Sequence, residues 1–199
     1  MKYYKREDFF SDNNTLASYW AGFIAADGCI YDNKLSIHLN KKDLILLESF
    51  KKDISYEGNV SFYKNTVKLD FRNGRLCSDL LRIYNITPSK SLTLLPPNII
   101  DFEMIRSYIV GYIDGDGCIA KYNTRKTPVL YLVILGTEQL LKWISDFIFD
   151  NTLIVGKISK PSSVYKLTYT CSKAKTVCNF LIRDQSRFLE RKWRYIDNC

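Results

Sequence analysis

The stretch Trp20-Ala-Gly-Phe-Ile-Ala-Ala-Asp-Gly28 returns later in the chain as Ile109-Val-Gly-Tyr-Ile-Asp-Gly-Asp-Gly117. Each copy is rich in apolar and small residues and ends in an acid followed by glycine, which predicts an apolar helix with a defined end. A chain that builds this helix twice can bring Asp27 and Asp116 side by side. Because a helix C-terminus already carries about half a negative charge, two facing carboxylates there require a cation. A divalent metal ion held by oxygen ligands is the candidate that this pattern favours.

Further matches in the same order extend the duplication beyond the motif. Asp27-Gly-Cys-Ile30 repeats as Asp116-Gly-Cys-Ile119, and similar strand and helix patterns follow each copy. A fixed order of similar segments indicates two homologous halves rather than a chance pair of helices. We therefore predict an N-terminal half at 1–95 and a C-terminal half at 96–199, joined as one compact chain by a linker at 91–101.

Hydrophobic periodicity predicts the order αββαββα in each half, and therefore an α+β fold with antiparallel sheets. The elements expected in the first half are helix 16–26, strands 29–31 and 34–40, helix 44–52, strands 60–63 and 66–72, and helix 76–84. Those expected in the second half are helix 102–115, strands 118–122 and 129–135, helix 138–149, strands 155–160 and 164–171, and helix 174–195.

Local signals support the boundaries of these elements. Asn13, Asn14 and Thr15 can cap the first helix, and Gly28 is expected to end it in a left-handed conformation. Asp32-Asn33 predicts a tight hairpin turn between the first two strands.

Alternating residues in the predicted strands give each sheet one apolar face and one polar face. In strand 66–72, apolar residues alternate with Lys68, Asp70 and Arg72. The chain carries 29 Lys and Arg against 21 Asp and Glu, a net charge of +8 and a pI near 9.1. A basic fold with polar sheet faces suits phosphate contacts and the reading of base edges in duplex DNA. A solvated surface on a basic protein that binds no nucleic acid is the alternative that remains open.

Composition excludes several other classes of protein. The first residues lead into no apolar signal core, and the longest apolar run, 131–135, is far too short to span a bilayer. We expect a soluble intracellular protein, from bacterial or phage cytoplasm or from an organelle. Six cysteines without CxxC spacing and a single histidine, His38, exclude the usual zinc arrays. Cys29 and Cys118 follow the two acids and are expected to be small buried residues.

These residues together resemble the LAGLIDADG homing endonucleases, in the monomeric form with two motifs. The similarity covers almost the whole chain, including the segments 86–96, 135–137 and 189–193. It implies a saddle of two antiparallel sheets with the motif helices packed at the interface between the halves. The small residues Ala21, Gly22, Gly111 and Gly115 would allow the two backbones to approach closely.

The resemblance also implies a metal site. Asp27 and Asp116 would hold the ion, assisted by the backbone carbonyls of Ala26 and Gly115. The expected ion is Mg²⁺, with Mn²⁺ or Ca²⁺ as possible occupants. The sixth motif position differs between the copies, because it is Ala25 in the first and Asp114 in the second.

The resemblance also implies a basic or amide side chain near each acid that assists catalysis. By alignment, Lys90 and Lys192 form the expected pair, and Lys41 is an additional candidate whose equivalent is Gly136. Arg187 is a weaker substitute for Lys192. Each lysine could equally be a surface or phosphate-positioning residue.

The function implied is that of a site-specific endonuclease, a hydrolase that cuts both strands of DNA in intron homing. Its partner would be double-stranded DNA with a long pseudo-palindromic or asymmetric target, bound by a monomer without contact to a membrane. The alternatives are an intron RNA-splicing maturase or a non-cleaving DNA-binding protein on the same fold. A purely structural domain would leave the duplicated acids unexplained.

Strand alternation assigns the residues expected to face DNA, and a slip of one residue would reverse each set. In the first half they are Tyr31, Asn33, Ser36, His38, Asn40, Ser61, Tyr63, Lys68, Asp70 and Arg72. In the second half they are Tyr122, Thr124, Arg125, Tyr131, Lys157, Ser159, Lys166, Thr168 and Thr170.

Overall fold

The computed structural model describes residues 6–12, 14–124, 127–161 and 163–196, except for the side chains of residues 123, 124 and 127. Arg125 and the side chain of Thr124, both expected to face DNA, lie outside this description. The elements of the first half are α1 (Thr15–Asp27), β1 (Gly28–Tyr31), β2 (Lys34–Asn40), η1 (Lys41–Asp43), α2 (Leu44–Asp53), β3 (Ser61–Phe62), β4 (Thr66–Arg72), α3 (Gly74–Tyr84) and η2 (Lys90–Leu92).

The second half repeats the order α, two strands, α, two strands, α. Its elements are α4 (Phe102–Asp116), β5 (Gly117–Thr124), β6 (Thr127–Gly136), α5 (Glu138–Thr152), β7 (Lys157–Ser159), β8 (Tyr165–Thr170), α6 (Cys171–Ile182) and the added short helix α7 (Glu190–Trp193). Each half forms an antiparallel four-stranded sheet, with strand orders β1-β2-β4-β3 and β5-β6-β8-β7. The predicted α+β class and the pattern of two antiparallel sheets are confirmed.

Local sequence signals set several of these boundaries. The Asn14 side chain caps α1 by accepting a hydrogen bond of 2.8 Å from the backbone N–H of Ala17. Asp32 and Asn33 both have positive φ, 47° and 55°, which gives the β1–β2 hairpin the left-handed turn residues that match strand twist. The predicted cap and turn are therefore present.

The prediction that Gly28 ends its helix in a left-handed conformation is wrong. Gly28 has φ −86° and ψ 161°, and Gly117 has φ −88° and ψ 156°, so both are extended. Glycine is required for another reason, because a Cβ would lie 2.8 Å from the Ile24 carbonyl oxygen at Gly28 and 2.6 Å from the Ile113 carbonyl oxygen at Gly117. The chain can therefore pass directly from each motif helix into a strand.

The prediction of one helix at 174–195 is also wrong. The segment contains α6, which ends at Ile182, and the four-residue helix α7. Arg183 is extended with ψ 126°, and Asp184 has a left-handed φ of 57°, so the backbone turns away from the α6 axis. The chain after this turn reaches the first half and the end of α4, as the hydrogen bonds below show.

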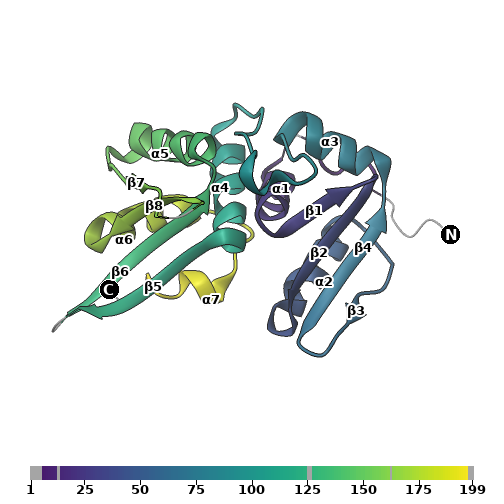
Figure 1. Cartoon of the computed structure of the whole chain (residues 1–199), viewed down its shortest axis with the longest axis horizontal. Helices are drawn as coiled ribbons and strands as arrows, with labels where there is room; N and C mark the ends of the chain where they lie inside the picture. The colour runs from purple at the N-terminus through teal and green to yellow at the C-terminus, as the bar shows by residue number, and fades with distance from the viewer. Residues whose placement is uncertain (1–5, 13, 125–126, 162, 197–199) are drawn as a thin grey trace.

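The helices α1 and α4 stand side by side in the middle of the molecule (Figure 1). Residues 17–25 of α1 are all buried, so this helix has no solvent-facing side. A Cβ at Gly22 would lie 2.8 Å from the carbonyl carbon of Tyr108, and one at Gly111 would lie 2.8 Å from that of Tyr19. The two glycines therefore allow a reciprocal backbone contact that other residues would prevent.

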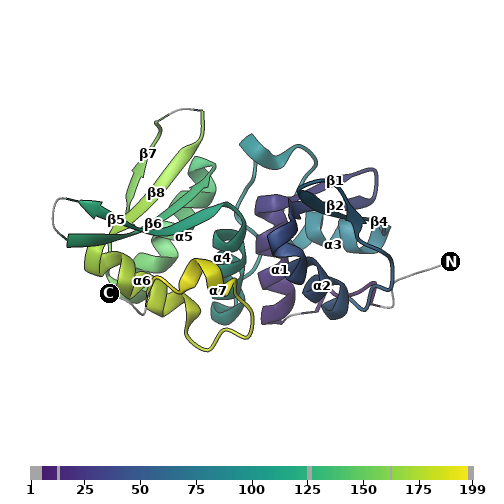
Figure 2. The same cartoon turned by 90° about the horizontal axis from the view of Figure 1, so that it is seen from below.

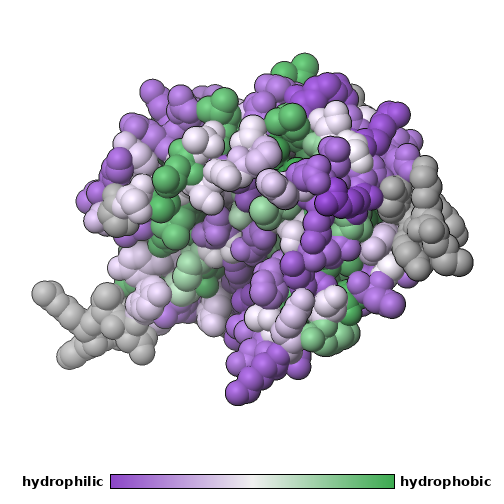
Figure 3. All heavy atoms as spheres, turned by 45° about the vertical axis from the view of Figure 1, so that its right-hand side comes forward, coloured by the Kyte–Doolittle hydropathy of each residue, from purple (hydrophilic) through white to green (hydrophobic). Residues whose placement is uncertain are grey.

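The two sheets slope away on either side of this helix pair (Figures 1 and 2). Their inner faces are apolar, and the core positions of the central strands include Leu35, Ile37, Val67, Leu69, Leu132, Ile134, Leu167 and Tyr169. Seen with the first half forward, the surface is mostly hydrophilic, with separate hydrophobic patches (Figure 3). The acids at the ends of α1 and α4 lie where the two sheets begin.

Replacing Gly22 with alanine tests the helix contact. Because the clash is with backbone atoms rather than with a flexible side chain, we expect Gly22→Ala to lower the free energy of unfolding by roughly 2 kcal/mol or more. Urea denaturation followed by circular dichroism measures the change. Gly74→Ala is the matched control, since its Cβ would meet no atom closer than 3.8 Å. Because Gly74 begins α3 and has no positive φ, this control should be unchanged or stabilised by at most about 1 kcal/mol. Equal stability of Gly22→Ala and the unmutated chain would contradict the contact.

Candidate active site at the ends of the motif helices

The two motif helices end at the same place with one acid each. Asp27 is the last residue of α1 and Asp116 the last residue of α4. Their preceding residues are in contact, because a Cβ at Gly115 would overlap the Ala26 side chain. Neither carboxylate forms a hydrogen bond or an ion pair with another residue in the described part of the chain. The two acids predicted to lie side by side are thus together at the seam between the helices.

This arrangement disfavours the charged form of both acids. Both side chains keep contact with solvent, yet partial burial raises the pKa of Asp27, and the neighbouring charge of Asp116 raises it further. Partial burial also raises the pKa of Asp116, against the opposing charges of Lys90 and Lys192. Two like charges near two helix C-termini form a site that a cation would stabilise.

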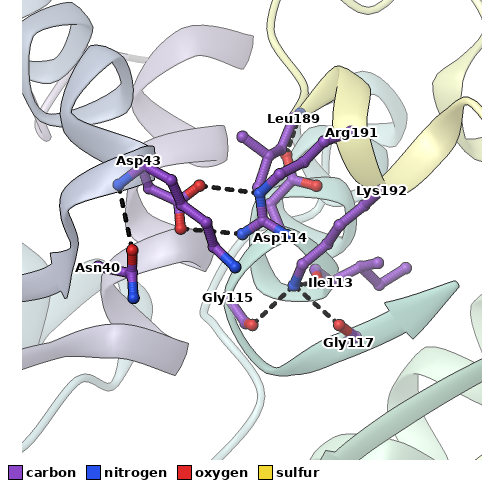
Figure 4. A network of polar contacts seen from close by, with 10 residues as sticks. Asn40, Asp43, Ile113, Asp114, Gly115, Gly117, Leu189, Arg191 and Lys192 are labelled. Carbon is purple, nitrogen blue, oxygen red and sulfur yellow. Dashed lines mark hydrogen bonds and ion pairs between the residues drawn. The ribbon is translucent and has the colours of Figure 1, made fainter. Parts of the chain in front are cut away.

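Two lysines occupy matching places beside these acids. Lys90 Nζ donates to the carbonyl oxygens of Gly28, at 2.6 Å, and Ala26, at 3.3 Å. Lys192 Nζ donates to the carbonyl oxygens of Gly115 and Gly117, both at 2.8 Å, as shown in Figure 4. The residues before and after each acid thus bind one ammonium group.

The lysines satisfy backbone carbonyls that a helix end leaves without partners. Burial lowers the pKa of Lys90 and of Lys192, while nearby carboxylates act in the opposite direction. The carbonyls of Ala26 and Gly115, expected to assist metal binding, each accept one of these hydrogen bonds. A carbonyl oxygen has two lone pairs, so this bond leaves one position for another partner.

The sixth motif position of the second copy has a structural role that the sequence did not predict. The Asp114 side chain is 2 % exposed and accepts hydrogen bonds from Tyr19 Oη at 2.8 Å, Leu189 N at 2.7 Å and Trp193 Nε1 at 2.7 Å. Burial raises its pKa to about 6 despite these three donors. Asp114 therefore joins α1, α4 and α7, and α7 carries Lys192.

The segment before and within α7 also bonds to the first half. Arg187 binds Asp53 at 2.7 and 2.9 Å, and Arg191 binds Asp43 at 2.8 and 2.9 Å. Figure 4 shows the second of these pairs. Trp20 Nε1 donates to the same Asp53 carboxylate at 2.8 Å. The expectation that Arg187 could substitute for Lys192 is wrong, because its guanidinium is committed to Asp53.

Lys41 differs from the other two lysines. It lies in η1 with an exposed side chain, and no hydrogen bond joins it to the ends of the motif helices within the described residues. The proposed equivalence with Gly136 is wrong, because sheet register places Gly136 opposite Tyr165 just as Leu39 lies opposite Val67. The turn that carries Lys41 is an insertion in the first half. Gly136 instead lines a cavity of about 280 Å³ together with Lys90, Tyr112 and Asp116.

The register of the predicted outward face is correct. The described members of both predicted DNA-facing sets are exposed or half-buried. Ser36 pairs with Asp70 and His38 with Lys68 across β2 and β4, so these residues share one face. Several are already bonded to neighbours, since Asp70 binds Lys34 at 3.0 Å and Lys68 at 2.8 Å.

The prediction that Cys29 and Cys118 are buried is wrong. Both are exposed free cysteines. Cys29 pairs with Ser36 and Cys118 with Val133, so each side chain shares the outward face of its sheet. Each cysteine lies two residues after its acid, as the second residue of β1 or β5, which places it beside the candidate site.

Comparison with known proteins finds similarity in three-dimensional structure but no match by sequence. No protein-family model matches the sequence, and no curated protein sequence matches it. The chain is similar in structure to the LAGLIDADG meganuclease I-AabMI bound to uncleaved DNA, with a TM-score of 0.67, 13 % identity and coverage of 93 % of this chain and 89 % of that one. It is also similar to the meganuclease I-SmaMI bound to uncleaveable DNA, with a TM-score of 0.66, 15 % identity and coverage of 93 % and 87 %.

A third solved structure agrees with these two. The I-LtrWI LAGLIDADG homing endonuclease bound to target DNA gives a TM-score of 0.63 at 16 % identity, covering 92 % of this chain and 88 % of that one. The fold expected from the sequence resemblance, that of the LAGLIDADG homing endonucleases, is thereby confirmed. In the described part of the chain, no helix is both long and apolar enough to cross a membrane.

The raised pKa of Asp27 and of Asp116 predicts how the protein's thermal stability depends on pH when no metal ion is bound. A carboxyl whose pKa is higher in the folded state than in the unfolded state favours folding at low pH, and this contribution is lost as pH rises through the folded pKa. We expect Asp27→Asn and Asp116→Asn to melt at a higher temperature than the unmutated chain at neutral pH in a chelator. The difference should shrink as pH falls and vanish below about pH 2.5, well under the unfolded pKa of about 3.9, where both carboxyls are protonated in either state. Melting curves across this pH range provide the measurement, and a lower melting temperature of both variants at neutral pH would contradict the repulsion.

Proposed function

We propose that this chain is a site-specific endonuclease that hydrolyses phosphodiester bonds in both strands of duplex DNA. The observation that carries the proposal is the matched pair of sites at the ends of α1 and α4. Each has a carboxylate, Asp27 or Asp116, that has no partner among the described residues, and a lysine, Lys90 or Lys192, bonded to the carbonyls beside it. Two such sites in one chain suit the cutting of two strands.

The residues present fit a divalent metal ion such as Mg²⁺. Asp27, Asp116 and the free lone pairs of the Ala26 and Gly115 carbonyls offer the oxygen ligands that hard cations prefer. Among the described residues, no cluster of three or more His, Cys, Asp or Glu side chains forms a closed metal site. This donor set is incomplete in the protein alone, as expected for a site completed by phosphate oxygens. When bound, the ion would activate water and neutralise charge on the leaving oxygen.

The lysines have two tasks in this proposal. Their hydrogen bonds fix the chain on both sides of each acid, which holds the carboxylates in place. Their positive charge lies where a scissile phosphate would approach, so it would favour the extra negative charge of the transition state. Lys41 has no corresponding place and would contact DNA only as a surface cation.

DNA binding rests on charge and on the outward sheet faces. The net charge of +8 favours a polyanion, and the outward face of each sheet carries exposed or half-buried polar residues. The structurally similar proteins I-AabMI, I-SmaMI and I-LtrWI are each bound to DNA in their solved structures. Two related but non-identical sheets in a monomer suit a long target that is pseudo-palindromic or asymmetric.

A non-cleaving DNA-binding protein is the second candidate. The specific observation in its favour is that the lysines already satisfy the carbonyls of Ala26 and Gly115 and lie close to both acids. In such a protein the ammonium groups would serve in place of the metal. Cleavage measured with and without Mg²⁺ separates the two candidates.

Single replacements of the motif acids test the cleavage mechanism. Duplex targets selected from a random-sequence plasmid library serve as the substrate. We expect Asp27→Asn and Asp116→Asn to keep DNA affinity within a few fold and to slow double-strand cleavage by more than about a hundredfold, since each removes a metal ligand. Glu48→Gln is the matched control, because Glu48 is an exposed acid paired only with Lys51 in the described residues. Double-strand cutting at full rate by either aspartate variant would refute the assignment.

The salt dependence of binding tests the nucleic-acid partner itself. If the polar faces neutralise six or more phosphates, affinity should fall by roughly a thousandfold or more between about 50 and 200 mM salt. Fluorescence anisotropy with labelled duplex DNA measures this slope in the presence of Ca²⁺. Affinity that does not change with salt would argue against a phosphate-binding surface.

A further inference from the structure

The outward faces of the two sheets carry different side chains at equivalent positions. The pairing of residues between strands shows which positions are equivalent. Gly28 pairs with Ile37, and Gly117 pairs with Ile134, so Ile37 and Ile134 occupy the same place in their halves. The residues that precede these isoleucines are Ser36 and Val133, and those that follow are His38 and Leu135. Where β2 of the first sheet carries two polar side chains, the equivalent strand β6 of the second sheet carries two aliphatic ones.

The neighbouring strand shows the same change. Leu69 pairs with Ile37 and Leu167 with Ile134, so Asp70 of β4 is equivalent to Thr168 of β8, and Arg72 to Thr170. The first sheet thus carries a charged network, in which Asp70 binds Lys34 and Lys68. In the second sheet Thr168 and Thr170 replace Asp70 and Arg72, and Tyr131 replaces Lys34, while Lys166 keeps the positive charge of Lys68.

Val133 and Leu135, two positions apart in β6, share the outward face of the second sheet and form an aliphatic strip. Val133 pairs with Cys118 on one side and with Thr168 on the other. Leu135 is 41 % exposed, and Val133 is half-buried. Aliphatic surface that stays exposed to water is unfavourable, and a partner that covers it removes this surface from water. The strip therefore suits a partner with an apolar group.

The apolar group that duplex DNA offers in its major groove is the 5-methyl of thymine. We infer that Val133, Leu135 and Thr168 select thymine through its methyl group in the half of the target bound by the second sheet. This inference rests on the proposed function. Since Cys118 and Val133 lie at the end of the sheet next to Asp116, the thymines concerned lie in the inner part of that half-site.

The first sheet reads its half of the target differently. Ser36, His38 and the charged group of Lys68, Asp70 and Arg72 offer hydrogen bonds rather than apolar surface. Donors and acceptors of this kind distinguish bases by their edge atoms and gain nothing from a methyl group. The preference for thymine methyls should therefore belong to one half-site only.

Deoxyuridine provides the test because it differs from thymidine only by the missing methyl. Duplexes selected from a random library by the full chain in Ca²⁺ are resynthesised with deoxyuridine for thymidine, in one half-site at a time. We expect affinity to fall about fourfold for each buried methyl removed, in the inner part of one half-site only. Equal effects in both half-sites, or none in either, would overturn the inference while leaving the endonuclease proposal intact. Failure to select any DNA would overturn both.

Substitutions that exchange the residues at equivalent positions of the two sheets test whether the strip causes the sensitivity to deoxyuridine. Val133→Ser should abolish the deoxyuridine sensitivity, and Ser36→Val should create it in the opposite half-site. Melting curves of both variants establish that they fold. Sensitivity that persists in folded Val133→Ser and Leu135→His proteins would show that another surface detects the methyl group, and would overturn the assignment.

Discussion

The backbone contact between α1 and α4 is the constraint on which the other features depend. Gly22 lies against the Tyr108 carbonyl and Gly111 against that of Tyr19, so the helices approach more closely than side chains would allow. Both helices end together, and a strand of each sheet begins at the next residue. The packing of one helix pair therefore places the two acids at one point and determines where both outward sheet faces start.

This packing has an electrostatic cost at the helix ends. Two carboxylates lie near two sets of unsatisfied carbonyls, and the charge of Asp116 raises the pKa of Asp27. Lys90 and Lys192 reduce this cost by donating to the carbonyls around each acid. The protein thus holds negative charges together without neutralising them fully, which is what the proposed divalent cation would use.

The approximate twofold symmetry is broken in two places with different consequences. Asp114 has no acidic counterpart in the first copy, and its hydrogen bonds to Leu189 and Trp193 hold the helix that carries Lys192. Arg187 and Arg191 then join this segment to the first half, so Lys192 depends on contacts with both halves. The sheet faces differ as well, which suits the asymmetric target of the proposed endonuclease.

The sequence by itself determined the duplication, the order of elements, the two acids, the matching lysines and the register of the outward faces. The lysines were implied by the resemblance to the LAGLIDADG homing endonucleases, and the other features follow from short-range rules: helical and strand periodicity, caps and the spacing of repeated motifs. Only the tertiary structure decided the role of Asp114, the commitment of Arg187 to Asp53, the break between α6 and α7 and the exposure of Cys29. Each of these depends on which distant groups meet in space, because a buried carboxylate or a guanidinium binds the partner that packing brings to it.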